Sequence, residues 1–98
     1  GLPGLRDEGL LASALNRPRQ ALAYSAPDVF DLAAFYAAGI IKNHPFLDGN
    51  KRAGFMAAYT FLGINGYDLE ADEADVLLKT LALAAGECSE VGYAEWLR

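Results

Sequence analysis

The apolar residues of this chain recur mostly with the period of a helix. From Asp28 to about Asn43, and again from about Asn50 to Asn65, they cover nearly every side of the predicted helix. Helices that are apolar on all sides lie in the centre of a fold. Gly39 and Gly54 within these runs favour close packing between neighbouring helices. No stretch alternates between apolar and polar residues for long enough to form a sheet. We therefore expect an all-α fold, a compact helical bundle with two central helices.

A further helix should precede the central pair. Asp7 can cap a helix that runs to about Arg17. Pro18 should end this helix, because proline lacks the main-chain N–H and clashes with the preceding turn. Residues 19–26 are then expected to form an extended connector.

Two more helices should follow the central pair. Gly66 should end the second central helix in a left-handed conformation, and residues 67–71 should be extended. Asp72 can begin a helix that Gly86 stops, and Ser89 can cap the last helix. The apolar side chains expected to face inward from these two helices are Leu77, Leu78, Leu81, Ala85, Val91, Trp96 and Leu97.

A polar loop joins the two central helices, with the sequence His44-Pro45-Phe46-Leu47-Asp48-Gly49-Asn50-Lys51-Arg52. It brings a histidine, a carboxylate and two cations together between two runs that should be buried. Pro45 biases the residue before it away from helical backbone, so the first central helix should end near Asn43. Such a loop does not help folding, so we interpret it as a site of chemistry.

The second half of the loop has the features of an anion site. Gly49 permits a turn that is closed to other residues, and Asn50 is a good N-cap for the helix that follows. The amides from about Gly49 to Arg52 would then point together from a helix N-terminus, which favours anions. The helix dipole disfavours the cations Lys51 and Arg52 at this end, and a bound phosphate would explain them.

The first half of the loop supplies groups that could act on a bound ligand. His44 is the only histidine of the chain, and an imidazole exchanges protons near neutral pH, which suits a general base. Asp48 suits a hard cation such as Mg²⁺, which proteins usually hold through one or two carboxylates together with phosphates. The alternative for Asp48 is a structural carboxylate that accepts main-chain N–H bonds. Pro45 and Phe46 are interpreted as structural anchors that fix the loop on the core.

Composition narrows the classes of function. The net charge of −5 argues against a direct binder of nucleic acid or of anionic membranes, because both need a basic face. No apolar run is long and helical enough to span a bilayer. The single cysteine, Cys88, cannot form an internal disulfide, which fits a reducing cytoplasm. We therefore expect one domain over residues 1–98, located in the cytoplasm.

The loop sequence HPFLDGNKR resembles the signature of the Fic/Doc superfamily, whose usual form is H-P-F-x-(D/E)-G-N-G-R-x-x-R. Lys51 stands where the AMP-transferring branch has its second glycine, and Phe55 stands where that branch has its final arginine. In both departures the chain resembles the death-on-curing (Doc) branch, whose loop carries the sequence N-K-R. Doc-like chains usually carry another helix before this point, and we expect that helix to be missing here. The segments that add to the resemblance are residues 1–4, 9–15, 61–66 and 85–89.

The resemblance implies a Fic fold and a role for each residue of the loop. His44 would accept the proton of a target hydroxyl, and Asp48 would hold Mg²⁺ on the phosphates of ATP. Gly49 and Asn50 would shape the cradle for the phosphates, and Lys51 and Arg52 would bind the phosphoryl groups and neutralise their charge. The implied catalytic residues are His44, Asp48, Lys51 and Arg52.

The Doc branch also implies an activity and a partner. Its members are toxins of toxin–antitoxin pairs that transfer the γ-phosphate of ATP to a protein hydroxyl, and an antitoxin covers the active-site groove. The target class of the family is the translation elongation factor Tu. The lysine at position 51 would fill the space of the α-phosphate, so that the nucleotide binds reversed. Two alternatives stay open: transfer of AMP through the same loop, and a non-catalytic module that binds a nucleotide or a partner.

Overall fold

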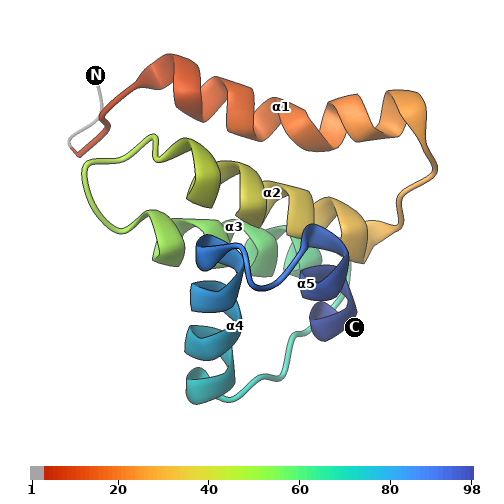
Figure 1. Ribbon diagram of the computed structural model, residues 1–98. Helices are drawn as coiled ribbons and strands as arrows, with labels where there is room; N and C mark the ends of the chain where they lie inside the picture. The colour runs from red at the N-terminus through yellow and green to blue at the C-terminus, as the bar shows by residue number, and fades with distance from the viewer. Residues whose placement is uncertain (1–3) are drawn as a thin grey trace.

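Residues 4–98, which the computed structural model describes, form five helices (Figure 1). Over these residues there is no strand, and the single β-bridge joins Leu5 to Phe46. The predicted all-α fold class is therefore confirmed. The helices are α1 (Glu8–Tyr24), α2 (Val29–Asn43), α3 (Asn50–Ile64), α4 (Glu73–Ala85) and α5 (Glu90–Leu97).

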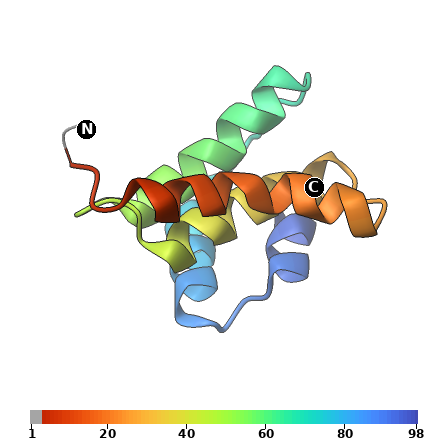
Figure 2. The same cartoon turned by 90° about the horizontal axis from the view of Figure 1, so that it is seen from above.

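The central helix is α2, which contacts all four other helices. In Figure 1 it lies between α1 above and the α4–α5 pair below, with α3 behind it. The view from above in Figure 2 shows that α3 runs at an angle to α2 and that its far end projects from the other helices. The Asp28 side chain caps α2 by accepting from the Asp31 N–H, and the Asp31 carboxylate accepts from the Asp28 N–H in return. The predicted span of this helix is confirmed. The buried core around it is formed by Ala33, Ala34, Ala37, Ala38, Ile41, Ala58, Leu62, Leu83, Tyr93, Ala94 and Leu97.

Helices α2 and α3 pack closely against each other at Gly54. A Cβ atom added there would lie 2.7 Å from Cγ1 of Ile41 and 2.9 Å from the carbonyl oxygen of Ala37. Both distances are shorter than real contacts allow, so a side chain at position 54 would force the two central helices apart. Because the loop with His44 joins these helices, their spacing also fixes the geometry of the loop.

We expect Gly54→Ala to lower the free energy of unfolding, and Gly63→Ala in the same helix to serve as its control. No atom lies within 4 Å of a Cβ added at Gly63. Both variants gain the helix propensity of alanine, so that contribution cancels in their difference. The remaining cost of overpacking at Gly54 should be about 1–3 kcal/mol in urea unfolding. Equal stability of the two variants would show that the helices can separate without loss.

Helix α1 continues through Pro18 to Tyr24, so the prediction that Pro18 ends the helix and that residues 19–26 form a connector is wrong. Proline cannot donate to the carbonyl four residues earlier, which here belongs to Ala14. Ala14 and Pro18 are both buried, and a Cβ atom added at Gly39 of α2 would lie 2.9 Å from that carbonyl oxygen. The packing of α1 on α2 therefore outweighs the cost of about 3 kcal/mol that proline carries inside a helix.

The predicted inner face of α4 is also wrong. The buried residues of this helix are Thr80 and Leu83, and Oγ1 of Thr80 lies 3.0 Å from the hydroxyl of the fully buried Tyr93 in α5. Burial raises the pKa of the Tyr93 phenol above its usual value. Ala85 is exposed. The leucines expected inside are exposed by 60% (Leu77), 65% (Leu78) and 42% (Leu81).

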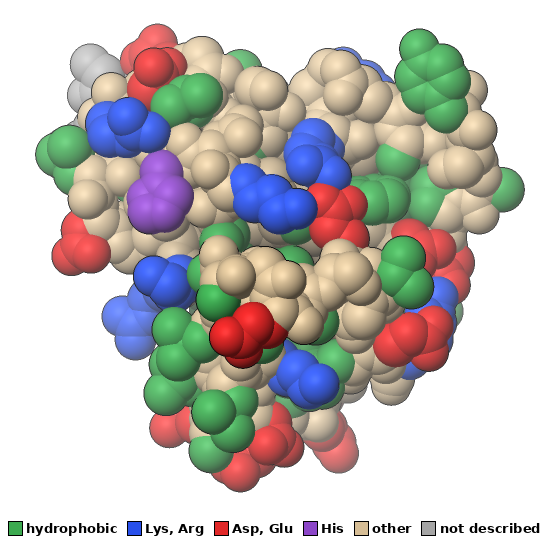
Figure 3. Space-filling model, viewed as in Figure 1, with side chains coloured by type: hydrophobic (Ala, Val, Ile, Leu, Met, Phe, Trp, Pro, Cys, Tyr) green, Lys and Arg blue, Asp and Glu red, His purple; other side chains and the backbone are tan. Residues whose placement is uncertain are grey.

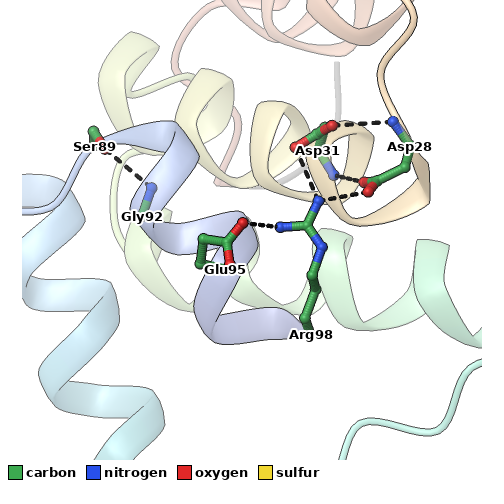
Figure 4. Close-up of polar contacts among 6 residues, drawn as sticks. All are labelled: Asp28, Asp31, Ser89, Gly92, Glu95 and Arg98. Carbon is green, nitrogen blue, oxygen red and sulfur yellow. Dashed lines mark hydrogen bonds and ion pairs between the residues drawn. The ribbon is translucent and has the colours of Figure 1, made fainter.

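Helix α5 ends beside the start of α2. Its N-cap is Ser89, as predicted, whose hydroxyl accepts from the Gly92 N–H at 3.0 Å (Figure 4). At the other end, Arg98 pairs with Asp28, Asp31 and Glu95. The Arg98 guanidinium, helped by the Asp31 N–H, holds the pKa of the Asp28 carboxyl below its ordinary value. Of the three side chains predicted to face inward from α5, Leu97 is buried, Trp96 is partly buried and Val91 is exposed.

Candidate functional site

The loop between α2 and α3 lies at one end of the molecule, next to the segment that leads into α1 (Figure 1). Main-chain hydrogen bonds join the two segments. The Arg6 and Asp7 N–H groups donate to the carbonyl of Pro45 at 2.7 and 3.0 Å, and the Leu47 N–H donates to the carbonyl of Gly4 at 2.8 Å. The chain before α1 therefore acts as a brace for the first half of the loop.

His44 occupies a backbone conformation that few side chains adopt. Its φ and ψ are 50° and 53°, and it is the only residue other than glycine with a positive φ among residues 4–98. The helix ends at Asn43 as predicted, but His44 turns left-handed. The Arg6 side chain holds this turn, since its Nε donates to the His44 carbonyl at 2.7 Å and its Nη2 donates to the Asn43 carbonyl at 3.1 Å. Left-handed turns are common at helix ends, where glycine usually takes them, and they cost energy for a residue with a side chain.

Arg6 is a site residue that sequence reasoning missed. It precedes α1 by two residues in sequence and lies 38 residues from His44. The sequence gives only a weak indication of this role. Arg6 is a single arginine before a helix cap, and no periodic pattern links it to the loop. Its two-point contact with the end of α2 shows only in three dimensions.

Asn50 is the first residue of α3 rather than its N-cap, so the prediction of an N-cap at this position is wrong. The cap is Gly49, which has φ 73° and therefore takes the left-handed turn that its lack of a side chain allows. The Asn50 side chain is buried and points back into the loop. Its Oδ1 accepts from the Phe46 N–H at 3.0 Å, and its Nδ2 donates to the Phe46 carbonyl at 2.9 Å. Nδ2 also lies 3.2 Å from Nδ1 of His44.

Asp48 is exposed, and its Oδ1 accepts from the Gly49 N–H at 2.8 Å. Asp48 therefore accepts one main-chain N–H bond, as the structural alternative for this residue predicts. Among residues 4–98, no three His, Cys, Asp or Glu side chains gather closely enough to hold a metal ion. Asp48 therefore fits Mg²⁺ only as one carboxylate beside the phosphate oxygens of a bound ligand, which is a common arrangement for this ion.

Lys51 and Arg52 are exposed, and within the described part of the chain neither side chain forms an ion pair or a hydrogen bond. The main-chain N–H groups of the first turn of α3, at residues 50–52, also have no carbonyl partner there. Donors and positive charge are thus both available at the start of α3. This combination favours an anion.

His44 and Lys51 line the same open groove, which has a volume of about 490 Å³ and continues along α4. The histidine, purple in Figure 3, lies at the surface with Lys and Arg side chains near it, and hydrophobic side chains gather below, over α4. The α4 side of the groove is apolar, with Leu78, Leu81 and Ala82 among its lining residues. A base, a cation and an apolar wall therefore face one space.

Pro45 is fully buried and Phe46 is partly buried, so both side chains sit between the loop and the helices. Lys42, close to the loop in sequence, is engaged elsewhere: its Nζ lies 3.3 Å from the Glu90 carboxylate of α5, which also pairs with Arg17 of α1. Since Arg6 is also engaged, by the carbonyls of Asn43 and His44, Lys51 and Arg52 are the cations of the loop without such contacts in residues 4–98. The arrangement can bind a phosphate-like anion beside a histidine that exchanges protons.

Two comparisons with known proteins bear on this site. The model of the family described as "Fic/DOC family" matches residues 1–62, which include the whole loop. Over 71 residues the chain is 46% identical to the protein named "Toxin Doc" from Mycolicibacterium smegmatis (strain ATCC 700084 / mc(2)155), a match that covers 69% of this chain and 54% of that protein. The chain thus spans about half the length of the curated relative it matches. In residues 4–98, no helix has both the length and the hydropathy needed to cross a membrane.

Proposed function

We infer from its membership of the Fic/DOC family, together with the geometry of the loop, that this chain is the catalytic part of a toxin that transfers phosphate from ATP to a protein hydroxyl. The observation that carries the proposal is the groove that His44 and Lys51 both line, at the start of α3 where main-chain amides are free. A relative named Toxin Doc supports the toxin assignment. The target class that the family implies is the elongation factor Tu.

Each loop residue has a defined task in this reaction. The hydroxyl oxygen of the target attacks the γ-phosphorus, and its proton passes to the ring nitrogen of His44 that carries a lone pair. The bond from the γ-phosphorus to the bridging oxygen breaks, and ADP leaves. The amides of residues 50–52, with Lys51 and Arg52, bind the phosphates and stabilise the charge that moves to the leaving oxygen. Asp48 would hold Mg²⁺, which neutralises phosphate charge when it is bound.

The choice of phosphate over AMP rests on Lys51. Its side chain lines the groove with His44, where the AMP-transferring branch has a glycine and therefore an empty space. A cation at this point attracts phosphates but leaves less room for an α-phosphate that carries a whole nucleoside. Transfer of AMP by the same loop is the rival reaction, and a non-catalytic binding module is the other alternative.

ATP labelled at either the γ- or the α-phosphate separates these three functions. The purified protein is incubated with Mg²⁺, each labelled ATP and elongation factor Tu, and the protein products are separated. We expect label from the γ-position alone on the target. Label from the α-position would establish AMP transfer, and no label from either, with this target or in a cell extract, would favour the binding module.

The residue that braces the loop should also matter for this reaction. We expect Arg6→Ala to reduce γ-phosphate transfer by about 10- to 100-fold, because a small displacement of His44 costs rate even where binding persists. Arg6 is exposed, so the free energy of unfolding should change little. Arg19→Ala is the matched control, since Arg19 is an exposed cation of α1 that does not touch the loop. If both variants retain full transfer, the Arg6 contacts are dispensable.

We further propose that an antitoxin covers the groove, through a flexible segment that orders when it binds. Exposed apolar side chains next to a polar site are typical of interaction surfaces. Leu78 and Leu81 provide such a surface on the wall of the groove that faces His44 and Lys51. An apolar segment seated there would block the histidine.

Growth in cells tests the antitoxin. Expression of this protein should arrest growth, and co-expression of the protein encoded by the neighbouring gene should restore it. Leu78→Glu in the groove should remain toxic but resist this rescue, because an apolar segment seated there would have to cover a charged side chain. Val91→Glu, on an exposed apolar residue outside the groove, should be rescued like the natural chain. Rescue of Leu78→Glu to the same degree would place the antitoxin elsewhere.

A further inference from the structure

The amide of Asn50 has a single orientation in the loop. Its Oδ1 accepts from the Phe46 N–H and its Nδ2 donates to the Phe46 carbonyl, so a flip of the amide would lose both hydrogen bonds. The flip would also leave a buried donor and a buried acceptor facing their own kind, which costs about 1–3 kcal/mol for each unsatisfied group. The main chain of Phe46 therefore decides which atom of Asn50 faces the histidine.

The atom that faces His44 is a donor. Nδ2 carries two hydrogens: one goes to the Phe46 carbonyl, and the other is available to Nδ1 of His44, which lies 3.2 Å from Nδ2. An imidazole nitrogen can accept this hydrogen only if it carries a lone pair. In the neutral ring the proton must then lie on the other nitrogen, Nε2.

We propose that Asn50 is a positioning residue that holds neutral His44 in the tautomer with its proton on Nε2. The loop thereby presents an N–H group at Nε2 and keeps the basic nitrogen, Nδ1, occupied by the amide of Asn50. The family motif does not specify the tautomer of the histidine. The tautomer follows from the three contacts of the buried Asn50 side chain, two with the main chain of Phe46 and one with His44.

The consequence for catalysis rests on the proposed function. When His44 takes the proton of a hydroxyl, both of its nitrogens become N–H donors, and Nδ1 can no longer accept from Asn50. The contact between Asn50 and His44 must therefore open for proton transfer to occur at Nδ1. Asn50 thus keeps the histidine from acting as a base until the loop rearranges around its substrates.

Nitrogen NMR of the imidazole reads the tautomer directly. The nitrogen with the lone pair resonates well downfield of the N–H nitrogen, and Nε2 is recognised by its couplings to both ring hydrogens. His44 is the only histidine of the chain, so a tag-free ¹⁵N-labelled sample gives one unambiguous ring. The measurement needs no ATP and no target. Failure of the proposed transfer reaction would therefore leave this test unaffected.

Two variants make the test specific to the amide. Asn50→Asp replaces the donor by an acceptor at the same point, which should move the proton to Nδ1 and the lone pair to Nε2. Asn65→Asp is the matched control: the Asn65 Nδ2 donates to the carbonyl of Phe61 at 2.8 Å, also four residues earlier, but far from the histidine along α3. This control should leave the ring unchanged.

At a pH where the ring is neutral, we expect a single downfield nitrogen, Nδ1, in the folded natural chain and a mixture of tautomers in the chain unfolded by urea. A lone pair on Nε2, or the same mixture in both states, would overturn the proposal. So would a folded Asn50→Asp variant that keeps the natural tautomer. If that variant does not fold, the comparison of folded and unfolded natural chain decides alone.

Discussion

Replacing His44 with alanine should abolish transfer while leaving the fold intact. His44 supplies the only imidazole of the chain, and loss of a general base costs on the order of 10²-fold or more in rate. The side chain is exposed and takes no part in the buried core. The measurement is the rate of label transfer from γ-labelled ATP to the target, together with urea unfolding of both chains.

Two controls distinguish loss of the base from loss of local packing or of ATP binding. Asn43→Ala, at the adjacent residue, removes a hydrogen bond to the Leu10 carbonyl but no base, so it reports on local packing. Binding of ATP should persist in His44→Ala, because the amides and cations at the start of α3 are retained. Transfer at the natural rate by the purified His44→Ala protein would show that another group takes the proton.

The central helices could be predicted closely because their sequence signals agree with each other. Asp28 and Asp31 form the capping box at the start of α2, Pro45 limits its end, and Gly66 takes the left-handed conformation after α3. Apolar residues on all sides predicted both helices at the centre. This is right for α2, which contacts all four other helices, but wrong for α3, which buries one face and, among the helices of residues 4–98, contacts only α2 and α4. Local rules suffice where capping, periodicity and breakers indicate the same boundary.

The errors occurred where tertiary contacts overrule local signals. Pro18 is a helix breaker by itself, yet it lies inside α1 because α1 packs tightly on Gly39 of α2. In α4 the residues expected inside, among them Leu77, Leu78 and Leu81, are exposed. The buried residues are Thr80 and Leu83, and Thr80 hydrogen-bonds to the buried Tyr93 of α5. The residues close in sequence to either partner of such a contact do not indicate that the contact forms.

The sequence pointed to the loop as the candidate site, but it did not indicate the hydrogen bonds within that loop. The loop motif named His44, Asp48 and Asn50, and the structure places His44 and Lys51 on one groove. The contacts of Asn50 with Phe46 and His44 could not be read from the sequence, because an asparagine at a helix start usually caps that helix. The brace from Arg6 was missed for the same reason: it joins residues 38 positions apart.

Replacing Lys51 with glycine should lower phosphate transfer by about 10²-fold or more and allow some transfer of AMP. The variant removes a cation from the charge-stabilising set and restores the glycine that leaves space for an α-phosphate. The side chain lines the groove with His44 and, in the described residues, has no ion-pair partner. The loss should exceed the gain, because Phe55 stands where the AMP-transferring branch has an arginine for the far phosphates.

The intact mass of the target after incubation with ATP separates the two products. Phosphate adds about 80 Da and AMP about 329 Da, the masses of the groups that these two phosphoryl-transfer reactions attach. Lys51→Ala removes the charge without creating the glycine, and Lys79→Ala removes an exposed cation of α4 that does not line the groove. We expect phosphate addition to fall with both changes at position 51 and to persist with Lys79→Ala. If the natural chain already adds AMP, Lys51 does not set the transferred group, and the chain is an AMP transferase that tolerates a lysine in its loop.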